Sequence, residues 1–243
     1  MPTREEIMAF VRQFLGRWVA RPDDVWVALY RLLLDYAHGV PRITDSNRLR
    51  RGAWRRRALQ VQGSLADAMN CRASQVEGNV DVLMGTLYPP GTQRMNPVGI
   101  AFACAVTCLV QRFGPGKYGW KMEARIGKDV FPALAGFRRK SVDVVAFRGH
   151  LPYAVLSTKW GMRHDRIRDP QEEADTYKGQ VSGLRFFVVT NEFDSARLGK
   201  LLQYPGIDGV FHVRSDLIGE IYRGMPAPAP GLKDLCDLFR LFP

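Results

Sequence analysis

The sequence predicts a mixed α/β (α+β) fold, in which a central mixed sheet is flanked by helices and follows a helical N-terminal region. Three observations predict this class. Apolar residues recur at helical spacing through the first third of the chain. Two β-rich segments joined by a short turn then lie within 141–160. After them, helical and strand patterns alternate up to residue 239, which is typical of strands packed against helices.

The first half of the chain is predicted to be helical. Apolar side chains recur three and four residues apart, and the breaks between the segments contain Pro and Gly. The helical segments predicted here are 4–19, 23–37, 64–87 and 97–113. We divide the chain into a helical N-terminal region, 1–62, and a core domain, 63–243.

The second half is predicted to alternate between strands and helices. The runs Ser141–Phe147 and Tyr153–Trp160 are rich in β-branched and aromatic residues, and the turn residues Arg148-Gly149-His150 between them predict a hairpin. The elements predicted after the hairpin are a helix from about Gln171, a strand at 185–190, a helix at 194–203, a strand at 208–213 and a helix at 232–239.

The charge of the chain indicates a polyanionic partner. Its 243 residues include 35 Lys and Arg against 24 Asp and Glu, a net charge of +11. Because 46% of the residues are hydrophobic, a disordered polycation is excluded, and nucleic acid is the leading partner for a basic globular protein. The alternative is a protein that is basic and merely soluble. The apolar runs fall short of the roughly 18 residues of a membrane span, and we recognise no secretory signal, so we expect a cytoplasmic protein.

An arginine cluster follows the first predicted helices. It contains no acidic residue, so its guanidinium groups repel one another unless anions neutralise them. One interpretation is contact with DNA phosphates, which would make binding steeply dependent on salt. The other interpretation is a solvated helix face. The cluster consists of Arg48, Arg50, Arg51, Arg55, Arg56 and Arg57. The N-terminal region that contains it, 1–62, is expected to contact DNA or to dimerise.

An acid and a lysine on the predicted hairpin are the first candidates for chemistry. Asp143 interrupts an apolar strand and so faces away from its apolar neighbours, and Lys159 lies in a strand that is otherwise apolar. Ser157 lies two residues before Lys159 and shares its face. Glu172 and Glu173 follow early in the next predicted helix, from which one carboxylate can point back at Asp143. Two carboxylates and a lysine suit Mg²⁺, which takes oxygen ligands and activates water beside a phosphate. A plain ion pair is the alternative.

This pattern resembles the PD-(D/E)xK nucleases, and within them the type II restriction endonucleases that read CCGG-like sites. In that group serine replaces the acid before x-K, and a helix supplies a carboxylate twelve or thirteen residues further on. Here Ser157-Thr158-Lys159 matches S-x-K, and Glu172 and Glu173 match the two spacings. Asp143 takes the place of the motif's aspartate, although Val142 stands where the family has proline. The resemblance implies a restriction-endonuclease-like fold for the core domain.

A second motif lies at the family's offset from the lysine. The group carries R-x-D-R starting four residues after the lysine, where this chain has Arg163-His164-Asp165-Arg166. Arginine side chains bind guanine O6 and N7, and an aspartate accepts a hydrogen bond from cytosine N4. The resemblance therefore implies that Arg163, Asp165 and Arg166 read the CC and GG of the site. A local salt-bridge ladder is the alternative interpretation.

The resemblance implies a Mg²⁺-dependent endonuclease that cuts double-stranded DNA at a palindrome with a CCGG-like or CCNGG-like core. Asp143 and Glu173, or Glu172 in its place, would hold the metal, and Lys159 would orient or activate the attacking water. A palindromic site implies a homodimer, and pairing of dimers into tetramers is left open. The resemblance also implies a prokaryotic cytoplasmic setting and a cognate DNA methyltransferase that acts on the same site.

Two further positions complete the expected site. The family carries another acid on an upstream helix, which we assign to Glu77, with Glu123 as the alternative. Either carboxylate is otherwise a surface group. Lys178, on the same predicted helix as Glu173, is expected to contact DNA phosphate or to be simply exposed.

Two other functions are compatible with these residues. A repair or recombination nuclease would keep the same core but recognise DNA structure in place of sequence. A non-catalytic DNA-binding module would bind CCGG-like duplexes with steep salt dependence and cut nothing.

Overall fold

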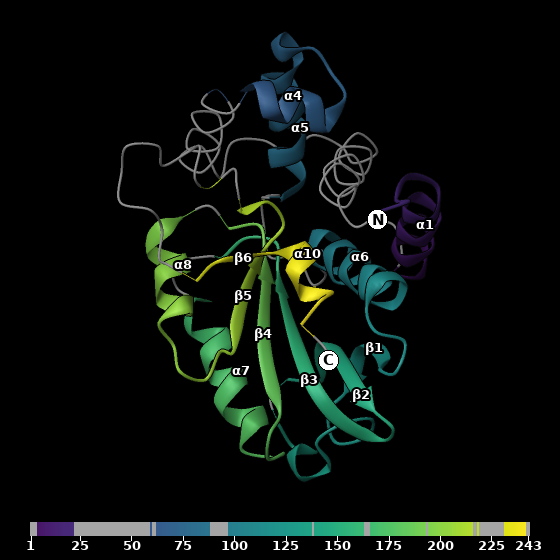
Figure 1. The fold of residues 1–243 in the computed structure, drawn as a ribbon, viewed down its shortest axis with the longest axis vertical. Helices are drawn as coiled ribbons and strands as arrows, with labels where there is room; N and C mark the ends of the chain where they lie inside the picture. The colour runs from purple at the N-terminus through teal and green to yellow at the C-terminus, as the bar shows by residue number, and fades with distance from the viewer. Residues whose placement is uncertain are drawn as a thin grey trace. The chain divides into compact units, whose positions relative to one another are not determined.

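The structure is a computed structural model that describes most of the chain. The described residues are 4–21, 59, 62–87, 97–137, 139–162, 166–192, 194–215, 218 and 231–241. The chain divides into two compact units, Met1–Ala101 and Phe102–Pro243. Figure 1 shows the helices of the first unit and the sheet of the second. This division reflects packing alone, so the functional boundary expected after residue 62 stays a prediction.

The first unit begins with the amphipathic helix α1, Arg4–Trp18, which confirms the helix predicted at 4–19. Ile7, Val11 and Leu15 recur every four residues and are buried, because residues at that spacing share one face of a helix. Two glutamates lie in the first turn, where carboxylates stabilise the positive end of the helix dipole.

The single helix predicted at 64–87 is wrong, because the chain turns between two helices there. Asn70 has a left-handed φ of 47°, which asparagine tolerates better than most residues. The N–H of Asn70 donates to Asp67 O at 3.1 Å, and that of Cys71 donates to Ala66 O at 3.0 Å, which is the bonding pattern of a Schellman cap. The elements around this turn are α4 (Gln62–Met69), the 3₁₀ turn η2 (Ala73–Gln75) and α5 (Val76–Leu87).

Within the described residues, the second unit is built on a six-stranded mixed sheet, which confirms the predicted fold class. The strand order β1-β2-β3-β4-β5-β6 follows the sequence. The first three strands pair antiparallel, and strands β3 to β6 pair parallel (Figure 1). The strands are β1 (Gly119–Arg125), β2 (Ser141–Arg148), β3 (Leu151–Lys159), β4 (Arg185–Thr190), β5 (Gly209–His212) and β6 (Lys233–Asp234).

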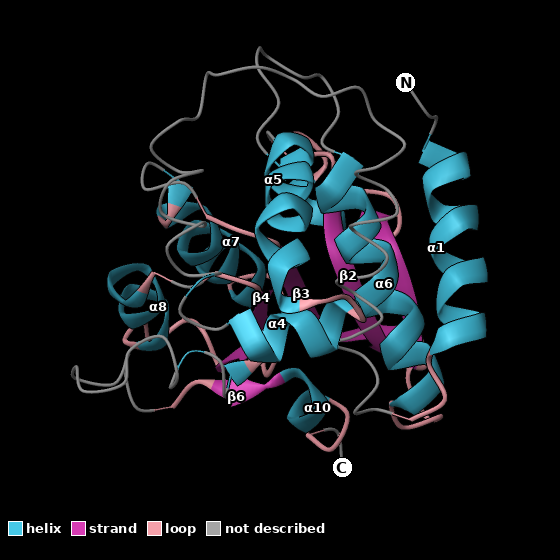
Figure 2. Cartoon of the chain, turned by 90° about the horizontal axis from the view of Figure 1, so that it is seen from above, coloured by secondary structure: helices cyan, strands magenta, loops and turns pink. Residues whose placement is uncertain are grey.

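Helices cover both faces of this sheet (Figure 2). Consecutive residues are buried at 144–146 of β2 and at 154–158 of β3, so neither face of the central strands meets solvent. α7 joins β3 to β4 and α8 joins β4 to β5, which supplies the helical crossover that a parallel strand pair needs. The helices are α6 (Pro97–Phe113), α7 (Arg168–Lys178), α8 (Ser195–Leu202) and α10 (Leu235–Leu238), with a 3₁₀ turn η3 (Pro132–Leu134).

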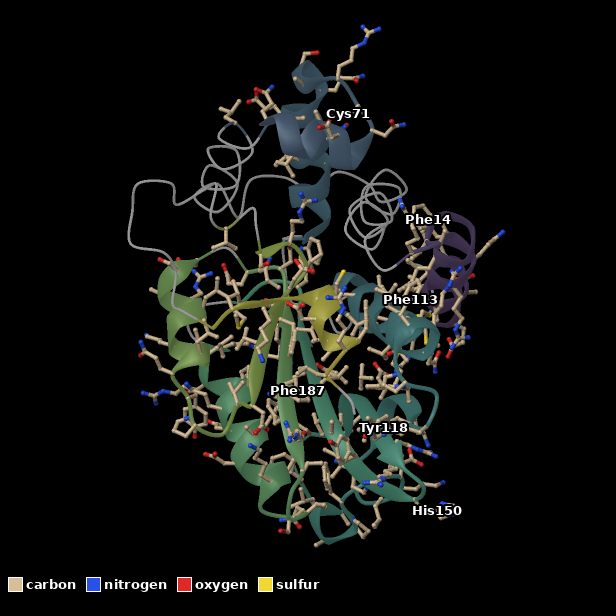
Figure 3. All side chains as sticks on the ribbon, viewed as in Figure 1. Phe14, Cys71, Phe113, Tyr118, His150 and Phe187 are labelled. Atoms are coloured by element: carbon tan, nitrogen blue, oxygen red, sulfur yellow. The ribbon has the colours of Figure 1, made fainter. Side chains whose placement is uncertain are left out.

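The predicted hairpin is confirmed as β2 and β3. Val145 pairs with Val155, and Gly149 takes a φ of 64° in the turn between the strands. His150 belongs to this turn (Figure 3), so the hairpin turn and Lys159 lie at opposite ends of β3. Any site built around Lys159 is therefore formed at the end of β3 that leads into α7.

The core of the sheet is aromatic and β-branched. Phe187 of β4 (Figure 3) meets Phe211 of β5 edge to face, with ring centroids 5.7 Å apart. Phe102 of α6 packs in the same manner on Trp160, directly after β3, with centroids 5.4 Å apart. Such pairs contribute about 0.5–1.5 kcal/mol beyond the area that they bury. The pair at Trp160 holds α6 against the end of β3, next to Lys159.

Three elements of the second unit differ from expectation. β1 was not predicted, because charged side chains alternate along this exposed edge strand and lower its β-propensity. α7 begins at Arg168 and not near Gln171. The last helix is shorter than predicted, because residues 233–234 first pair with β5. Among the helices of the described residues, none combines the length and hydrophobicity needed to cross a membrane.

Candidate active site

Asp143 lies near the start of β2 between two buried valines, Val142 and Val144. Strand alternation turns the valines to one face of the sheet and Asp143 to the other. Its Oδ2 accepts hydrogen bonds from Thr158 N at 2.8 Å, from Thr158 Oγ1 at 3.3 Å and from Lys159 Nζ at 3.1 Å. Oδ1 accepts no hydrogen bond from the described residues. One carboxylate oxygen of Asp143 is thus held by β3 while the other is available to a ligand.

Lys159 ends β3 and places its positive charge between two acids. Its Nζ lies 3.1 Å from Asp143 Oδ2 and 3.6 Å from Glu173 Oε1. Burial by itself would lower the pKa of the ammonium group, but the carboxylates of Asp143 and Glu173 outweigh burial and raise the pKa of Lys159 above its ordinary value. Lys159 is therefore a fixed positive charge at neutral pH.

Glu173, on α7, lies in the same cluster as Asp143 and Lys159. The buried residues of this helix lie three and four positions apart and form one face towards the sheet; they are Pro170, Glu173, Ala174 and Tyr177. Ser157 Oγ donates to Glu173 Oε2 at 2.9 Å. Glu172 is rotated by about 100° around the helix axis and is exposed. The structure therefore brings Glu173, and not Glu172, to Ser157 and Lys159.

Arg139 is a member of this cluster that the sequence analysis missed. It precedes β2, and its Nη2 lies 2.8 Å from Glu173 Oε1 and 3.4 Å from Asp169 Oδ2. The signal in the sequence is the basic run at 138–140 before a strand, which is hard to distinguish from a solvated turn. Thr158, the variable residue of the S-x-K motif, was also missed, although its N–H and hydroxyl both hold Asp143.

The protonation of Glu173 is shifted by its surroundings. Burial raises its pKa, the carboxylate of Asp143 raises it further, and the cations Lys159 and Arg139 offset only part of this effect. The net pKa of Glu173 is above its ordinary value, so the native chain holds this proton more tightly than the unfolded chain does.

This shift predicts a pH dependence of stability. As the pH rises above the ordinary value of 4.5, the unfolded chain loses its proton first, which favours unfolding until Glu173 ionises in the native state as well. Glu173→Gln cannot titrate at this position. The unfolding free energy of the wild type minus that of Glu173→Gln should therefore fall as the pH rises from about 4.5, when measured by urea unfolding. A difference that stays constant or rises would contradict the assignment of a raised pKa.

Asp143 and Glu173 are the two carboxylates of the cluster that could hold a hard divalent cation. One oxygen of each carboxylate is held by a hydrogen bond: Oδ2 of Asp143 accepts from Thr158 N, and Oε2 of Glu173 accepts from Ser157 Oγ. Oε1 of Glu173 is buried and accepts no hydrogen bond among the described residues, although it lies in ion pairs with Arg139 and Lys159. In the described part of the chain, no group of three or more His, Cys, Asp or Glu gathers around one point. Two carboxylates match the number that Mg²⁺ commonly takes from a protein, with water and phosphate completing its shell.

The predicted base-reading residues are only partly described. Arg166 is exposed and lies two residues before the start of α7. Arg163 and Asp165 lie outside the described residues, as do Arg48, Arg50, Arg51 and Arg55 of the arginine cluster. The roles predicted for all of these residues stay predictions.

Lys178 lies away from the cluster around Lys159. It ends α7, and its Nζ lies 2.8 Å from Oδ2 of Asp208, the residue immediately before β5. Asp208 also accepts a hydrogen bond from Phe186 N, at the start of β4. The start of β4 and Lys159 are separated by about five residues of parallel strand, or roughly 16 Å. A phosphate contact by Lys178 would therefore lie well away from the cluster.

The two candidates for the further acid lie on different elements. Glu77 lies in the first turn of α5, in the first unit. Glu123 has a φ of 50° and forms an irregularity in β1, because the pairing with β2 steps over it from Met122 to Ala124. Those two residues pair with Val144 and Val142, so the backbone of Glu123 lies beside that of Asp143. The assignment to Glu77 stays a prediction.

Comparison with known proteins adds no relative to this picture. No protein-family model matches the chain, and no curated protein matches it. The case for a function therefore depends on the geometry of Asp143, Ser157, Lys159 and Glu173.

Proposed function

We propose that this protein is a Mg²⁺-dependent endonuclease that cuts double-stranded DNA at a palindromic site with a CC/GG core, as type II restriction endonucleases do. One observation carries the proposal. Two carboxylates from different elements, Asp143 of β2 and Glu173 of α7, both lie within 3.6 Å of the Lys159 ammonium nitrogen. They lie in the order and spacing of the D…S-x-K…E pattern that the sequence predicts.

The residues of the chain have distinct roles in the proposed reaction. Asp143 and Glu173 would hold the metal through their carboxylates. Bound Mg²⁺ supplies Lewis acidity and lowers the pKa of a coordinated water. Ser157 and Thr158 keep the two carboxylates oriented through the hydrogen bonds to Oε2 and Oδ2.

Lys159 would stabilise negative charge in the transition state. With its pKa raised, the side chain stays protonated at neutral pH, so it can donate hydrogen bonds to a scissile phosphate or orient the attacking water. A preformed charge that needs no reorganisation is an effective way to stabilise an anionic transition state. The raised pKa favours this role over removal of a proton from water.

Recognition of the site is proposed from the sequence pattern. Arg166 and the preceding residues Arg163 and Asp165 would contact guanine and cytosine edges in the major groove. A palindromic site would be read by two copies of the chain related by two-fold symmetry. The net charge of +11 supports attraction to DNA phosphates in general.

Plasmid cleavage tests the proposal. Incubation of the protein with supercoiled plasmid DNA and Mg²⁺ should give discrete double-strand fragments, and EDTA should abolish them, because the site needs its cation. Nicking that depends on DNA structure would instead indicate the repair nuclease. Binding to CC/GG duplexes with no cutting in Mg²⁺ or Mn²⁺ would indicate a non-catalytic module.

A further inference from the structure

The chain that leaves β3 is held at Met162 by an ion pair between two residues that follow β4, the buried Glu192 and the partly buried Arg197. Glu192 follows β4 and is 5% exposed, and Arg197 lies on α8. Oε2 of Glu192 accepts the N–H of Met162 at 2.9 Å, and Nη1 of Arg197 donates to the carbonyl of Met162 at 2.7 Å. Arg197 Nη1 also donates to Glu192 Oε2 at 3.0 Å. One ion pair thus satisfies both backbone polar groups of one residue.

The pair is itself fixed in direction. The second oxygen of Glu192, Oε1, accepts the N–H of Asp194 at 2.8 Å, and Asp194 Oδ1 accepts the N–H of Arg197 at 3.0 Å as the cap of α8. The Glu192 side chain therefore cannot turn without losing its hydrogen bond from Asp194, the residue whose side chain caps α8. These hydrogen bonds therefore fix the backbone of Met162 relative to the end of β4 and the start of α8.

Stability alone is a weak reason for such a pair. Burying the Glu192 carboxylate costs free energy, and apolar residues of similar volume often stabilise a core as well as a buried ion pair does. An ion pair that hydrogen-bonds to the backbone also fixes the position of the residue to which it bonds. Here that point is three residues after Lys159 and immediately before Arg163.

We propose that Glu192 and Arg197 are positioning residues that set the path of the chain from β3 towards the DNA bases, and so determine how sharply the enzyme distinguishes its site from altered sites. This inference rests on the proposed function. Neither residue contacts substrate; each acts through the backbone of Met162. Because base contacts depend on hydrogen-bond geometry, a loosened anchor should weaken discrimination more than non-specific DNA binding.

The other end of β4 offers a matched control. Asp208 is also a carboxylate that accepts a backbone N–H, from Phe186 at 2.6 Å, and pairs with a cation, Lys178 at 2.8 Å. Asp208→Asn should lower stability in a comparable manner without touching Met162. If Asp208→Asn changed DNA binding through Lys178, the change would be in a phosphate contact, and binding to all DNA sequences would change by nearly the same factor.

The test compares cleavage of a duplex with the mapped site and of duplexes with one changed base pair in the CC/GG core. Arg197→Met should reduce the ratio of the two rates by about tenfold or more, the range that one good base contact supplies. Arg197→Lys should restore most of the ratio, because one ammonium nitrogen can donate to both Met162 O and Glu192. Glu192→Gln, which keeps the shape of the side chain, is the second variant and should lower the ratio as well. Asp208→Asn should leave it unchanged.

Each outcome decides the inference. Suppose that the wild type cuts specifically, but that Arg197→Met and Glu192→Gln keep the wild-type rate ratio. The positioning role is then wrong while the proposed function stands. The same conclusion follows if these variants lose no more of the ratio than Asp208→Asn does at an equal loss of melting temperature. If Arg197→Lys behaves as Arg197→Met, the role assigned to the shared nitrogen is wrong. If the folded wild type cuts no DNA, the proposed function fails, and this inference fails with it.

Discussion

Lys159→Ala should lower the rate of Mg²⁺-dependent DNA cleavage by roughly 100- to 1,000-fold, which is the usual cost of removing one preorganised transition-state donor. The side chain is the cation that both Asp143 and Glu173 face, at 3.1 Å and 3.6 Å. Its loss removes a fixed positive charge from the proposed place of the scissile phosphate. Single-turnover cleavage of a duplex with the mapped site measures the effect.

A surface lysine provides the control for this variant. Lys200 lies exposed on α8, and Lys200→Ala removes the same charge from the whole chain. It should cleave at close to the wild-type rate, which separates the local role of Lys159 from general attraction to DNA. Cleavage by folded Lys159→Ala at the Lys200→Ala rate would remove Lys159 from the mechanism.

Glu173→Gln should lower cleavage by roughly 100-fold or more, whereas Glu172→Gln should lower it little. A metal ion contributes several kcal/mol to the transition state, and each 1.4 kcal/mol is about tenfold in rate, so loss of one of two carboxylate ligands is severe. Glutamine keeps the shape of Glu173 and can still accept the hydrogen bond from Ser157 Oγ. The expected loss is therefore of charge and metal affinity, with little change in packing.

Titration of cleavage with Mg²⁺ measures this pair of variants. Glu173→Gln should need more Mg²⁺ for half-maximal rate, and Glu172→Gln should follow the wild-type curve. The reverse pattern would mean that the exposed Glu172 holds the metal and that the arrangement of α7 against Ser157 is not the active one.

The sequence predicts the central part of the site because it is local. Asp143, Ser157 and Lys159 lie on one hairpin. Strand alternation puts Ser157 and Lys159 on one face, and the pairing of Val144 with Leu156 places Asp143 on the same face. The sequence analysis did not choose between Glu172 and Glu173. Neighbouring residues of a helix point about 100° apart, and the start of α7 was predicted three residues late, so the face of the helix that carries each glutamate was not defined. Helix ends are commonly uncertain by one or two residues, which is enough to exchange a buried position for an exposed one.

The parts that the sequence missed depend on tertiary contacts. Arg139 pairs with residues of α7 that lie about thirty positions further along, and no local pattern links them. Glu192 and Arg197 contact Met162, which lies 30 and 35 positions earlier in the chain, in the same way. The turn at Asn70 is a local feature, but asparagine inside a helical pattern is common enough that its left-handed φ was not evident.

Mapping the ends of the cut DNA tests the central claim most directly. The wild-type protein is incubated with DNA of known sequence and Mg²⁺, and the fragment ends are sequenced, with EDTA as the control. The proposed function predicts that the ends gather at palindromes in which CC is paired with GG, either adjacent or split by one base pair, and that EDTA removes them. Ends scattered without regard to sequence, or gathered at sites that lack paired C and G, would contradict it.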